Sequence, residues 1–536
     1  MKPRPNQKRR FIRSAPVVAA AVVAMVLAGC GSSSSSGSST SSSTTPHSGG
    51  SLTVLEGSSF AGAWPGLDPA TDTDGAANQS YMDAIFGQLY QLGQGGKWIP
   101  DLATNISATN GGKTWVFTLR QGVKFTDGTP FNAQAVAYNW ARDLKSTCTC
   151  KPTFLAPPKI TVTGPYTIEL ALPYVDAPLL ADMQDDIFDW IASPTAVQSM
   201  GETAFALKPV GAGPFTVVSD SPSSELVLKA NPHYWQKGLP YLKSLTFKPV
   251  LDDETALKDL QSGAGQAYEG MSTPSLAPAF KAHFTTTTEP STSPYDIQLN
   301  TKIAPFNNIL AREAIYYATN TPLLDQKLFG NAYPVTQSFT AGAGLFYEPT
   351  VPGYITYNLA KAKALVKQVG GMSITLKTIT SPVAQTLDEG LAEMWEAAGM
   401  KVTLQNYDLT GLISVFLSGK WQAFLQTAGA WDPEGGVGVA FRFSSFSPFT
   451  GVHDPKVNAL LAQASGTLNM AQRQQFNQQL NAYIAKEAYG PFLFPIAGYN
   501  IADHGVAGPG LTTPIPSMAV LPEVLWQYIY NDNNAK

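Results

Sequence analysis

The clearest alternation of apolar and polar positions lies early in the chain. Apolar side chains occupy every second position over 115–119 and again at 123–125, and this period of two predicts β-strand on each side of a short turn. After the turn at 127–130, Asn132 is a favourable N-cap for a helix. Apolar residues then recur every fourth position, as they do along one helix face: Val136, Trp140 and Leu144. The pattern therefore predicts strand, strand and capped helix.

A second unit of strands follows. Residues 213–219 and 225–231 are predicted to be paired strands joined by the polar turn DSPSS. A further strand is expected over 245–250, and a helix from Asp253 ends at Gly263. The first half of the chain is thus rich in strands.

Helices and strands alternate after residue 358. The expected elements are a helix over 359–369 capped by Asn358, a strand over 373–379, a helix over 384–398, a strand over 401–407, a helix over 411–419 and a strand over 423–428. Alternation at this length predicts βαβ units and a largely parallel sheet. Two further helices are expected near 455–465 and 471–486, and a late strand within 492–502. The change of rhythm indicates two lobes.

The beginning of the chain differs in composition from everything that follows. A basic stretch without acidic residues precedes fourteen mostly apolar residues that end at Ala28. That run has the length of a signal-peptide core and is too short to span a bilayer. The sequence LAGC, which ends at Cys30, resembles the bacterial lipobox, whose cysteine is acylated. We therefore expect residues 1–29 to be a lipoprotein signal peptide and Cys30 the lipidated residue. The alternatives are an ordinary secretory cleavage site beside a chance cysteine and, because of the KRRFIR stretch, export by the twin-arginine route.

A tract of serine, threonine and glycine comes next, over 31–50. It cannot bury apolar surface, so we expect residues 30–50 to form a disordered linker. Twenty such residues have a root-mean-square reach of roughly 25 Å. The linker would hold the folded part near the outer face of the cytoplasmic membrane.

The charge balance excludes some partners. Removal of residues 1–29 takes away six of the 35 lysine and arginine residues and none of the 39 acidic ones, which leaves a net charge near −10. Such a surface does not suit nucleic acid. About 485 residues follow the linker, too many for one core, so two or three domains are expected. Cys148 and Cys150 would form a local disulfide or remain two thiols, and their spacing fits no zinc site.

The sequence shows no motif of an enzyme. Its five histidines are scattered singly, and no nucleophile elbow, zinc-binding helix or phosphate loop is present. A lone histidine is more often a surface or turn residue than a ligand. We therefore expect no catalytic residue, no metal and no cofactor. A secreted hydrolase that acts on glycans or peptides is the alternative to a non-catalytic protein.

Several motifs occur in order along the chain. The stretch TWVFTLRQGVKFTDGTPFNAQAVAYNW begins at Thr114, and the blocks LVLKANPHYW and LNTKIAPFNNILAREAIYYATN follow it. These motifs resemble the extracellular solute-binding proteins of family 5, the oligopeptide-, dipeptide- and nickel-binding components of ABC importers. Ala135 stands where the family has an acidic residue. The resemblance covers roughly residues 51–505.

The resemblance implies an α/β fold of the periplasmic-binding-protein type, with two lobes joined by a hinge and an extra subdomain inserted in the first lobe. The expected boundaries are 51–296 for lobe I, with the inserted subdomain at about 91–208, then 297–497 for lobe II and 498–536 for the return to lobe I. The ligand would lie in the cleft between the lobes and be enclosed when they close.

The resemblance also indicates residues that would contact the ligand. In the family, an aspartate in a loop after a tryptophan pairs with a ligand α-amino group, and the corresponding stretch here is AGAWDPEGG. Asp432 would be this anchor, but it stands two residues early and also matches a later acidic position of the family. No arginine is evident for a ligand carboxylate. The expected ligand-binding residues are Trp431, Asp432 and Gly429 in this loop, Tyr295 in the hinge-side strand, and Asp74 and Ala76 at the cleft edge of the other lobe.

The implied function is that of a lipid-anchored substrate-binding protein of an ABC importer. It would capture a peptide and deliver it to a permease, with permease and ATPase subunits and the membrane as partners, and would itself be a monomer. A non-peptide ligand, such as an oligosaccharide, an opine-like compound or a metal chelate, is the alternative within the same class.

Overall fold

The computed structural model describes most of the chain after residue 45. The described residues are 46–57, 66–72, 75–93, 97–146, 154, 156–185, 188–221, 224–250, 252–271, 274–288, 291–342, 344–427, 436–445, 447, 449–495, 498–515 and 523–534. Within these ranges no helix combines the length and the apolar character needed to cross a membrane.

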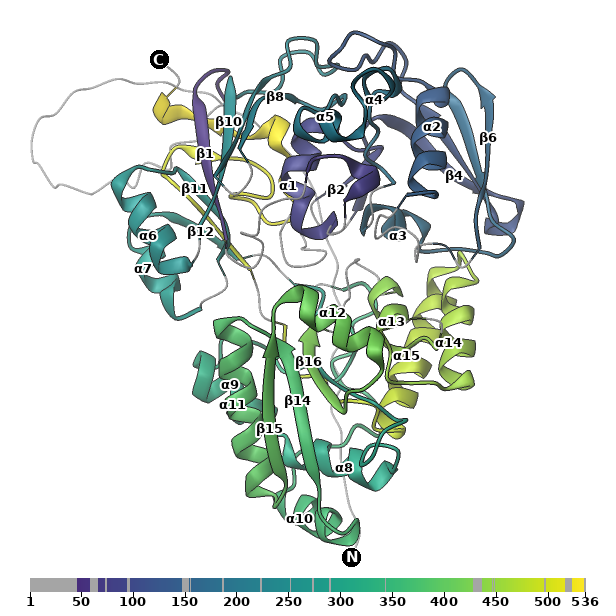
Figure 1. Cartoon of the computed structure of the whole chain (residues 1–536), viewed down its shortest axis with the longest axis vertical. Helices are drawn as coiled ribbons and strands as arrows, with labels where there is room; N and C mark the ends of the chain where they lie inside the picture. The colour runs from purple at the N-terminus through teal and green to yellow at the C-terminus, as the bar shows by residue number, and fades with distance from the viewer. Residues whose placement is uncertain are drawn as a thin grey trace, which may run out of the picture. The chain divides into compact units, whose positions relative to one another are not determined.

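The largest sheet of the described residues has seven strands in the order β12-β17-β11-β1-β10-β9-β8. Its central strand, β1, runs parallel to both neighbours, β10 and β11. The strands are β1 (Ser51–Glu56), β8 (Phe215–Ser221), β9 (Glu225–Ala230), β10 (Ser244–Pro249), β11 (Ala267–Met271), β12 (Thr285–Thr288) and β17 (Tyr499–Ala502). Figure 1 shows α6 (Asp253–Ser262) and α7 (Ala277–Lys281) beside β11 and β12. The sheet thus joins early strands with one from near the end of the chain.

The predicted strand and helix near residue 130 form a separate layer. The antiparallel sheet β4-β5-β7-β6 contains β4 (Ala103–Thr109), β5 (Thr114–Leu119), β6 (Lys159–Gly164) and β7 (Thr167–Ala171). Helix α2 (Ala133–Asp143) packs on β6 and β7, and the Asn132 side chain accepts a hydrogen bond from the Ala135 amide at 3.0 Å. This confirms the predicted cap.

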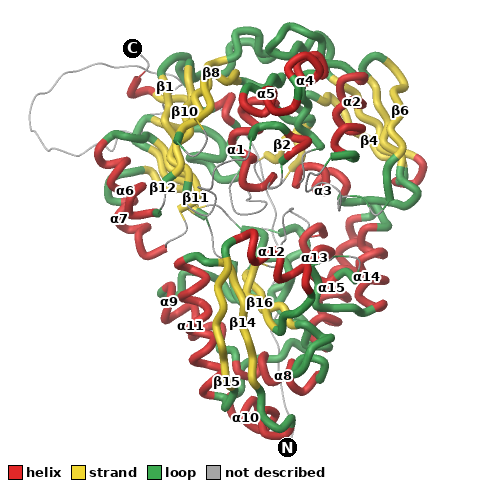
Figure 2. The backbone as a smooth tube through the Cα atoms, in the orientation of Figure 1, coloured by secondary structure: helices red, strands yellow, loops and turns green. Residues whose placement is uncertain are grey.

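The predicted parallel sheet is also confirmed. Its order is β13-β16-β14-β15, in which β14 runs parallel to β15 and β16, and β13 is antiparallel to β16. The strands are β13 (Tyr295–Leu299), β14 (Ser373–Ile379), β15 (Lys401–Tyr407) and β16 (Ala423–Thr427). Helices α11 (Pro382–Ala397) and α12 (Leu409–Ser418) pack against it, and Figure 2 shows α9 (Thr321–Phe329) next to α11.

The remaining elements surround these sheets. The helices are α1 (Gly75–Phe86), α3 (Leu179–Asp185), α4 (Pro194–Met200), α5 (Glu202–Leu207), α8 (Ile309–Ala318), α10 (Leu359–Gln368), α13 (Gly436–Phe443), α14 (Pro455–Ser465) and α15 (Met470–Lys486). Short strands pair as β2 (Tyr90–Gly93) with β3 (Lys97–Pro100) and as β18 (Val506–Ala507) with β19 (Tyr530–Asn531).

Two predicted strands are shorter in the structure. Of the late strand expected within 492–502, the described part contains only β17, at 499–502, and Phe492 forms a single bridge with Asp296. Proline explains this, because Pro495 lies within the segment and has no N–H to donate to a ladder. The alternation at 123–125 likewise yields one isolated bridge, between Lys124 and Pro130, although Val123 and Phe125 are buried as expected.

Buried apolar side chains form two large clusters. One contains residues from Leu52 to Phe247 together with C-terminal residues such as Trp526, and the other extends from Ile297 to Phe494. The two cores agree with an organisation in two lobes. The lobe boundaries remain predictions, and the one between residues 296 and 297 falls inside β13.

The chain passes twice between the seven-stranded sheet and the sheet β13-β16-β14-β15. The first passage comes before β13 and the second before β17. At one end of these connecting segments, Thr288 of β12 pairs with Tyr499 of β17 in antiparallel register. At the other end, the Tyr295 amide donates to the Phe494 carbonyl at 3.0 Å, and the Leu493 amide donates to the Tyr295 carbonyl at 2.8 Å. The two connecting segments are therefore tied side by side at both ends.

Candidate functional site

The carboxyl ends of the parallel strands are the expected position of a ligand site. In open α/β sheets, ligands bind outside these ends, where the loops that follow the strands meet. Strands β14, β15 and β16 end at Ile379, Tyr407 and Thr427. The segment that leaves β16, residues 428–435, contains the predicted Trp431 and Asp432 and lies outside the described residues. Its two neighbours in the chain, Thr427 and Gly436, are described.

Tyr295 is the predicted site residue that the structure describes most fully. It begins β13 directly opposite Thr427, the last residue of β16. The backbone bonds to Leu493 and Phe494 hold Tyr295 in place from the other side. Burial, and secondarily the carboxylate of Asp388, raises the pKa of the Tyr295 phenol to about 12. At neutral pH the side chain is therefore an uncharged hydrogen-bonding group next to the segment that leaves β16.

Asp388 adds a carboxyl group near Tyr295. It lies on α11, is fully buried, and accepts a hydrogen bond from the Asn406 amide at 3.4 Å. Burial raises the pKa of Asp388 to about 7, and the bond from Asn406 opposes this shift. The group thus titrates near neutral pH beside the uncharged Tyr295.

Asp296 and Arg442 form a buried pair of opposite charges near Tyr295. Asp296, the next residue of β13, has no exposed surface, and Arg442 lies in α13, the helix that follows the 428–435 segment. Burial raises the pKa of Asp296 to about 7, and Arg442 opposes this shift. Burial lowers the pKa of Arg442 to about 10, and Asp296 opposes that shift in turn. The Arg442 carbonyl also accepts bonds from the side chains of Gln298 and Thr450, both at 2.7 Å, so the end of α13 is firmly held.

Arg442 was not found by sequence reasoning. It stands in the apolar stretch GVGVAFRF, where an arginine is unusual, and that contrast was the available signal. Its partner Asp296 was hidden in a strand that otherwise alternates normally.

The seven-stranded sheet has a corresponding edge. Glu56 is the last residue of β1, and Glu269 faces it on the parallel strand β11. Both are buried, and the Ser80 hydroxyl of α1 donates to the Glu269 carboxylate at 2.8 Å. Burial raises the pKa of Glu269 to about 7, and burial together with Glu269 holds the pKa of Glu56 well above its usual range. The carboxyl ends of β1 and β11 therefore hold a carboxyl pair that retains a proton near neutral pH.

The predicted cleft edge adjoins the start of α1, the helix whose Ser80 donates to Glu269. Ala76 belongs to the first turn of α1, whereas Asp74 lies outside the described residues. Asp72 accepts a hydrogen bond at 2.9 Å from the side-chain amide of Asn78 in α1. Asp68 forms a two-point ion pair with Arg142, at 2.5 and 2.7 Å.

The predicted site residues are therefore only partly placed. The structure describes Tyr295, at the start of β13, and the backbone of Ala76, in the first turn of α1. The other predicted residues lie outside the described ranges: Cys30, Asp74, Gly429, Trp431 and Asp432, as do Cys148 and Cys150. In the described part of the chain, no group of His, Cys, Asp or Glu side chains is arranged to hold a metal ion.

Two solved structures define the class of fold. The binding protein DppA from Helicobacter pylori, solved with the peptide STSA, superposes with a TM-score of 0.76 at 20% identity, over 91% of this chain and 99% of that one. The dipeptide-binding protein from Pseudoalteromonas sp. SM9913, solved with Met-Leu, gives 0.77 at 17% identity, over 90% of this chain and all of that one (100%). The protein thus has the two-lobed α/β fold of the periplasmic binding proteins, as the sequence predicted.

Sequence comparison identifies the family. The model described as bacterial extracellular solute-binding proteins, family 5 Middle, matches residues 97–447. The glutathione-binding protein GsiB of Shigella flexneri is 26% identical over 457 residues, which are 81% of this chain and 82% of that protein. The GsiB protein of Salmonella typhi is 30% identical over 332 residues, 61% of this chain and 63% of that protein. The chain belongs to the bacterial extracellular solute-binding proteins of family 5. Members of this family are receptors for solutes, so the chain is a receptor and not an enzyme.

Proposed function

We propose that this receptor captures a peptide at the carboxyl ends of its parallel strands and delivers it to the permease of an ABC importer. The observation that carries the proposal is the pairing of Tyr295 with Thr427, because it fixes the point where the 428–435 segment leaves the sheet. The printed ligands of the similar proteins, glutathione, STSA and Met-Leu, support a peptide.

The proposed contacts divide between polar and apolar groups. Asp432 would pair with the α-amino group of the peptide, and Trp431 would cover its first side chain. Gly429 would allow close approach of the peptide backbone, and Tyr295 would supply a neutral hydroxyl. Asp74 and Ala76 would contribute from the other lobe.

Closure of the lobes would follow from differential binding. A ligand shifts a conformational equilibrium only by the difference of its affinities for the two states. A shift from 1:99 to 99:1 requires about 5.5 kcal/mol. Aromatic contacts and hydrogen bonds that form only in the closed state would supply this difference.

The lipid anchor is part of the same proposal. Acylation at Cys30 and a linker over 30–50 would keep the receptor at the outer face of the cytoplasmic membrane, near its permease. Several acyl chains contribute about 0.8 kcal/mol for each buried CH₂ group, which makes such anchoring stable.

A non-peptide ligand is the second candidate. The binding protein AgaA from A. tumefaciens, solved with agropinic acid, superposes with a TM-score of 0.73 at 19% identity. Opine-like compounds therefore belong in the first panel of ligands to be tested.

The decisive experiment starts with native mass spectrometry of the purified protein, which would detect a ligand that co-purifies. Titrations with free-amino and N-acetylated forms of one peptide then test the anchor. Asp432→Asn should weaken binding of the free-amino form more than that of the acetylated form, while Glu254→Gln, at an exposed carboxylate of α6, should not discriminate between them. Equal losses for both forms would reject the anchor, and conversion of the peptide into products would reject the receptor role.

A further inference from the structure

A cavity lies beside the end of β13 that is farther from the proposed peptide site. Its volume is about 320 Å³, and its lining includes Asn300, which directly follows β13, whereas Tyr295 begins that strand. The cavity is thus at the opposite end of β13 from Thr427 and the 428–435 segment. None of the residues proposed to contact the peptide lines this cavity.

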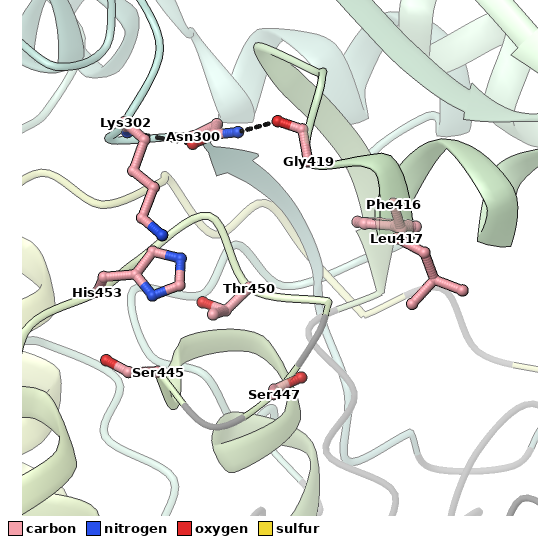
Figure 3. Close-up of a pocket in the computed structure, with 9 residues that line it drawn as sticks. All are labelled: Asn300, Lys302, Phe416, Leu417, Gly419, Ser445, Ser447, Thr450 and His453. Atoms are coloured by element: carbon pink, nitrogen blue, oxygen red, sulfur yellow. Dashed lines mark hydrogen bonds between the residues drawn. The ribbon is translucent and has the colours of Figure 1, made fainter.

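Two basic side chains stand together on one side of this cavity. Figure 3 shows the Lys302 side chain extending toward the ring of His453. Burial, and then the charge of Lys302, lowers the pKa of His453, which places the two groups in electrostatic contact. No carboxylate lines the cavity within the described ranges, in a chain that is acidic as a whole. Asp454, the next residue after His453, is engaged elsewhere, by the hydroxyls of Tyr483 and Tyr489. Two basic groups in a lining without a carboxylate are arranged to receive an anion.

Hydroxyl groups add uncharged donors. Ser445 and Ser447 line the cavity, and the Ser447 hydroxyl accepts a bond from the Phe449 amide, which leaves its proton available. The Asn300 amide is already engaged, because it donates to the Trp421 carbonyl at 2.9 Å. Asn300 therefore shapes the wall, while the lysine, the histidine and the serines supply the donors.

The opposite wall is apolar. Phe416 stacks on Phe424 with ring centres 3.8 Å apart, which fixes its position. Leu417, the next residue of α12, is 58% exposed. An exposed leucine beside a rigid aromatic ring gives the cavity a border that an apolar substituent of a ligand would cover.

We propose that this cavity is a binding site for a phosphate group. A phosphate group is anionic at neutral pH, and its oxygens accept short, charge-assisted bonds from ammonium, imidazole and hydroxyl donors. Lys302 supplies the positive charge, and His453 and the two serines supply directed donors. Phe416 and Leu417 border the side where the organic part of a phosphate ester would lie. Inorganic phosphate and the headgroup of an anionic phospholipid share this chemistry.

Calorimetric titration of the purified protein with inorganic phosphate tests the site, and thermal unfolding with and without phosphate provides a second measurement. Saturable binding and a higher midpoint of unfolding are expected for the wild type, since a ligand of the native state stabilises it. Lys302→Ala should weaken phosphate binding at least ten-fold, and His453→Gln should weaken it several-fold. Lys367→Ala, which removes an exposed lysine of α10 outside the cavity, is the charge-matched control and should bind as the wild type does.

Vesicles separate the two sources of phosphate. If binding to phosphatidylglycerol vesicles, but not to phosphatidylcholine vesicles, is lost in Lys302→Ala, the headgroup is the ligand; if only inorganic phosphate depends on Lys302, the ligand is soluble. The proposal is overturned if the wild type binds neither probe saturably, or if Lys302→Ala and Lys367→Ala bind equally well. Peptide binding is expected to stay unchanged in all three variants, so failure here is distinct from failure of the peptide proposal.

Discussion

Glu56 and Glu269 occupy facing positions on the adjacent parallel strands β1 and β11, and both carboxyl groups are buried. Ser80 donates one hydrogen bond to Glu269. Two buried carboxylates this close cannot both be ionised without a large electrostatic penalty. The native protein therefore holds a proton here that the unfolded chain gives up at neutral pH.

This pair predicts that stability falls as pH rises. The pKa of Glu269 is raised from 4.5 to about 7, so its contribution is fully present below pH 4.5 and is lost as pH rises through 7. A shift of this size corresponds to about 3 kcal/mol. Urea unfolding at pH 5 and pH 8 should therefore show a smaller pH-dependent loss of stability in Glu269→Gln than in the wild type.

The control for this measurement is Glu254→Gln, because Glu254 is exposed at the start of α6. It should keep the full pH dependence of the wild type. If Glu269→Gln and the wild type lose equal stability between pH 5 and pH 8, the proton is not held by this pair.

Gly490, in the segment that leads to β17, packs closely against the backbone of β13. A methyl group at this position would overlap the carbonyl oxygen of Ile297, which is part of the backbone and cannot rotate away. Gly490→Ala should lower the free energy of unfolding by about 1–3 kcal/mol or more. Gly342→Ala, where an added methyl group meets no neighbour within 4 Å, should change it by no more than about 0.5 kcal/mol. Similar urea midpoints for the two variants would contradict the close approach.

Tyr295 is predicted to act through its hydroxyl. Because its pKa is about 12, the phenol stays neutral at ordinary pH and serves as a hydrogen-bonding group. Tyr295→Phe should weaken peptide binding by about 1 kcal/mol, or roughly five-fold, without a comparable change in stability. Tyr295→Ala should cost more in both. Fluorescence titration and thermal unfolding measure the two effects, and unchanged affinity in Tyr295→Phe would assign the residue a purely packing role.

Cys30 is predicted to carry the lipid. Metabolic labelling with palmitate should mark the wild type and should vanish in Cys30→Ser, while a double Cys148→Ser, Cys150→Ser variant should remain labelled. Label that persists in Cys30→Ser would refute lipidation at this cysteine.

Local signals in the sequence were sufficient for some of the helix ends, although α11 and α12 each begin two residues before the predicted start. Asn132 caps α2 as predicted, and Gly263 ends α6 in a left-handed conformation with φ of 78°. Both features depend on a few neighbouring residues, whose side chains and backbone freedom are visible in the sequence. The part of the predicted late strand over the described residues 492–495 is wrong for the opposite reason, because the prediction followed the apolar residues and neglected Pro495.

Long-range pairing could not be predicted from local patterns. Nothing near Glu56 indicates that Glu269 will face it, and each residue alone resembles an ordinary charged residue at the end of a strand. The same holds for Asp296 and Arg442, and for Lys302 and His453, which meet only when distant segments fold together. The family resemblance indicated the proposed ligand-binding loop, but not these groups.

The position of β1 in its sheet has a consequence for biosynthesis. Both of its neighbours, β10 and β11, are made much later than β1, and β11 in turn pairs with β17, close to the end of the chain. Asn531 also donates a hydrogen bond to the carbonyl of Ser51, the first residue of β1. Contacts between distant segments form slowly. During translation, β1 would therefore remain unpaired until β10 and β11 have been synthesised. The seven-stranded sheet therefore cannot be completed until β17 has been synthesised, so this part of the growing chain stays incompletely folded until then.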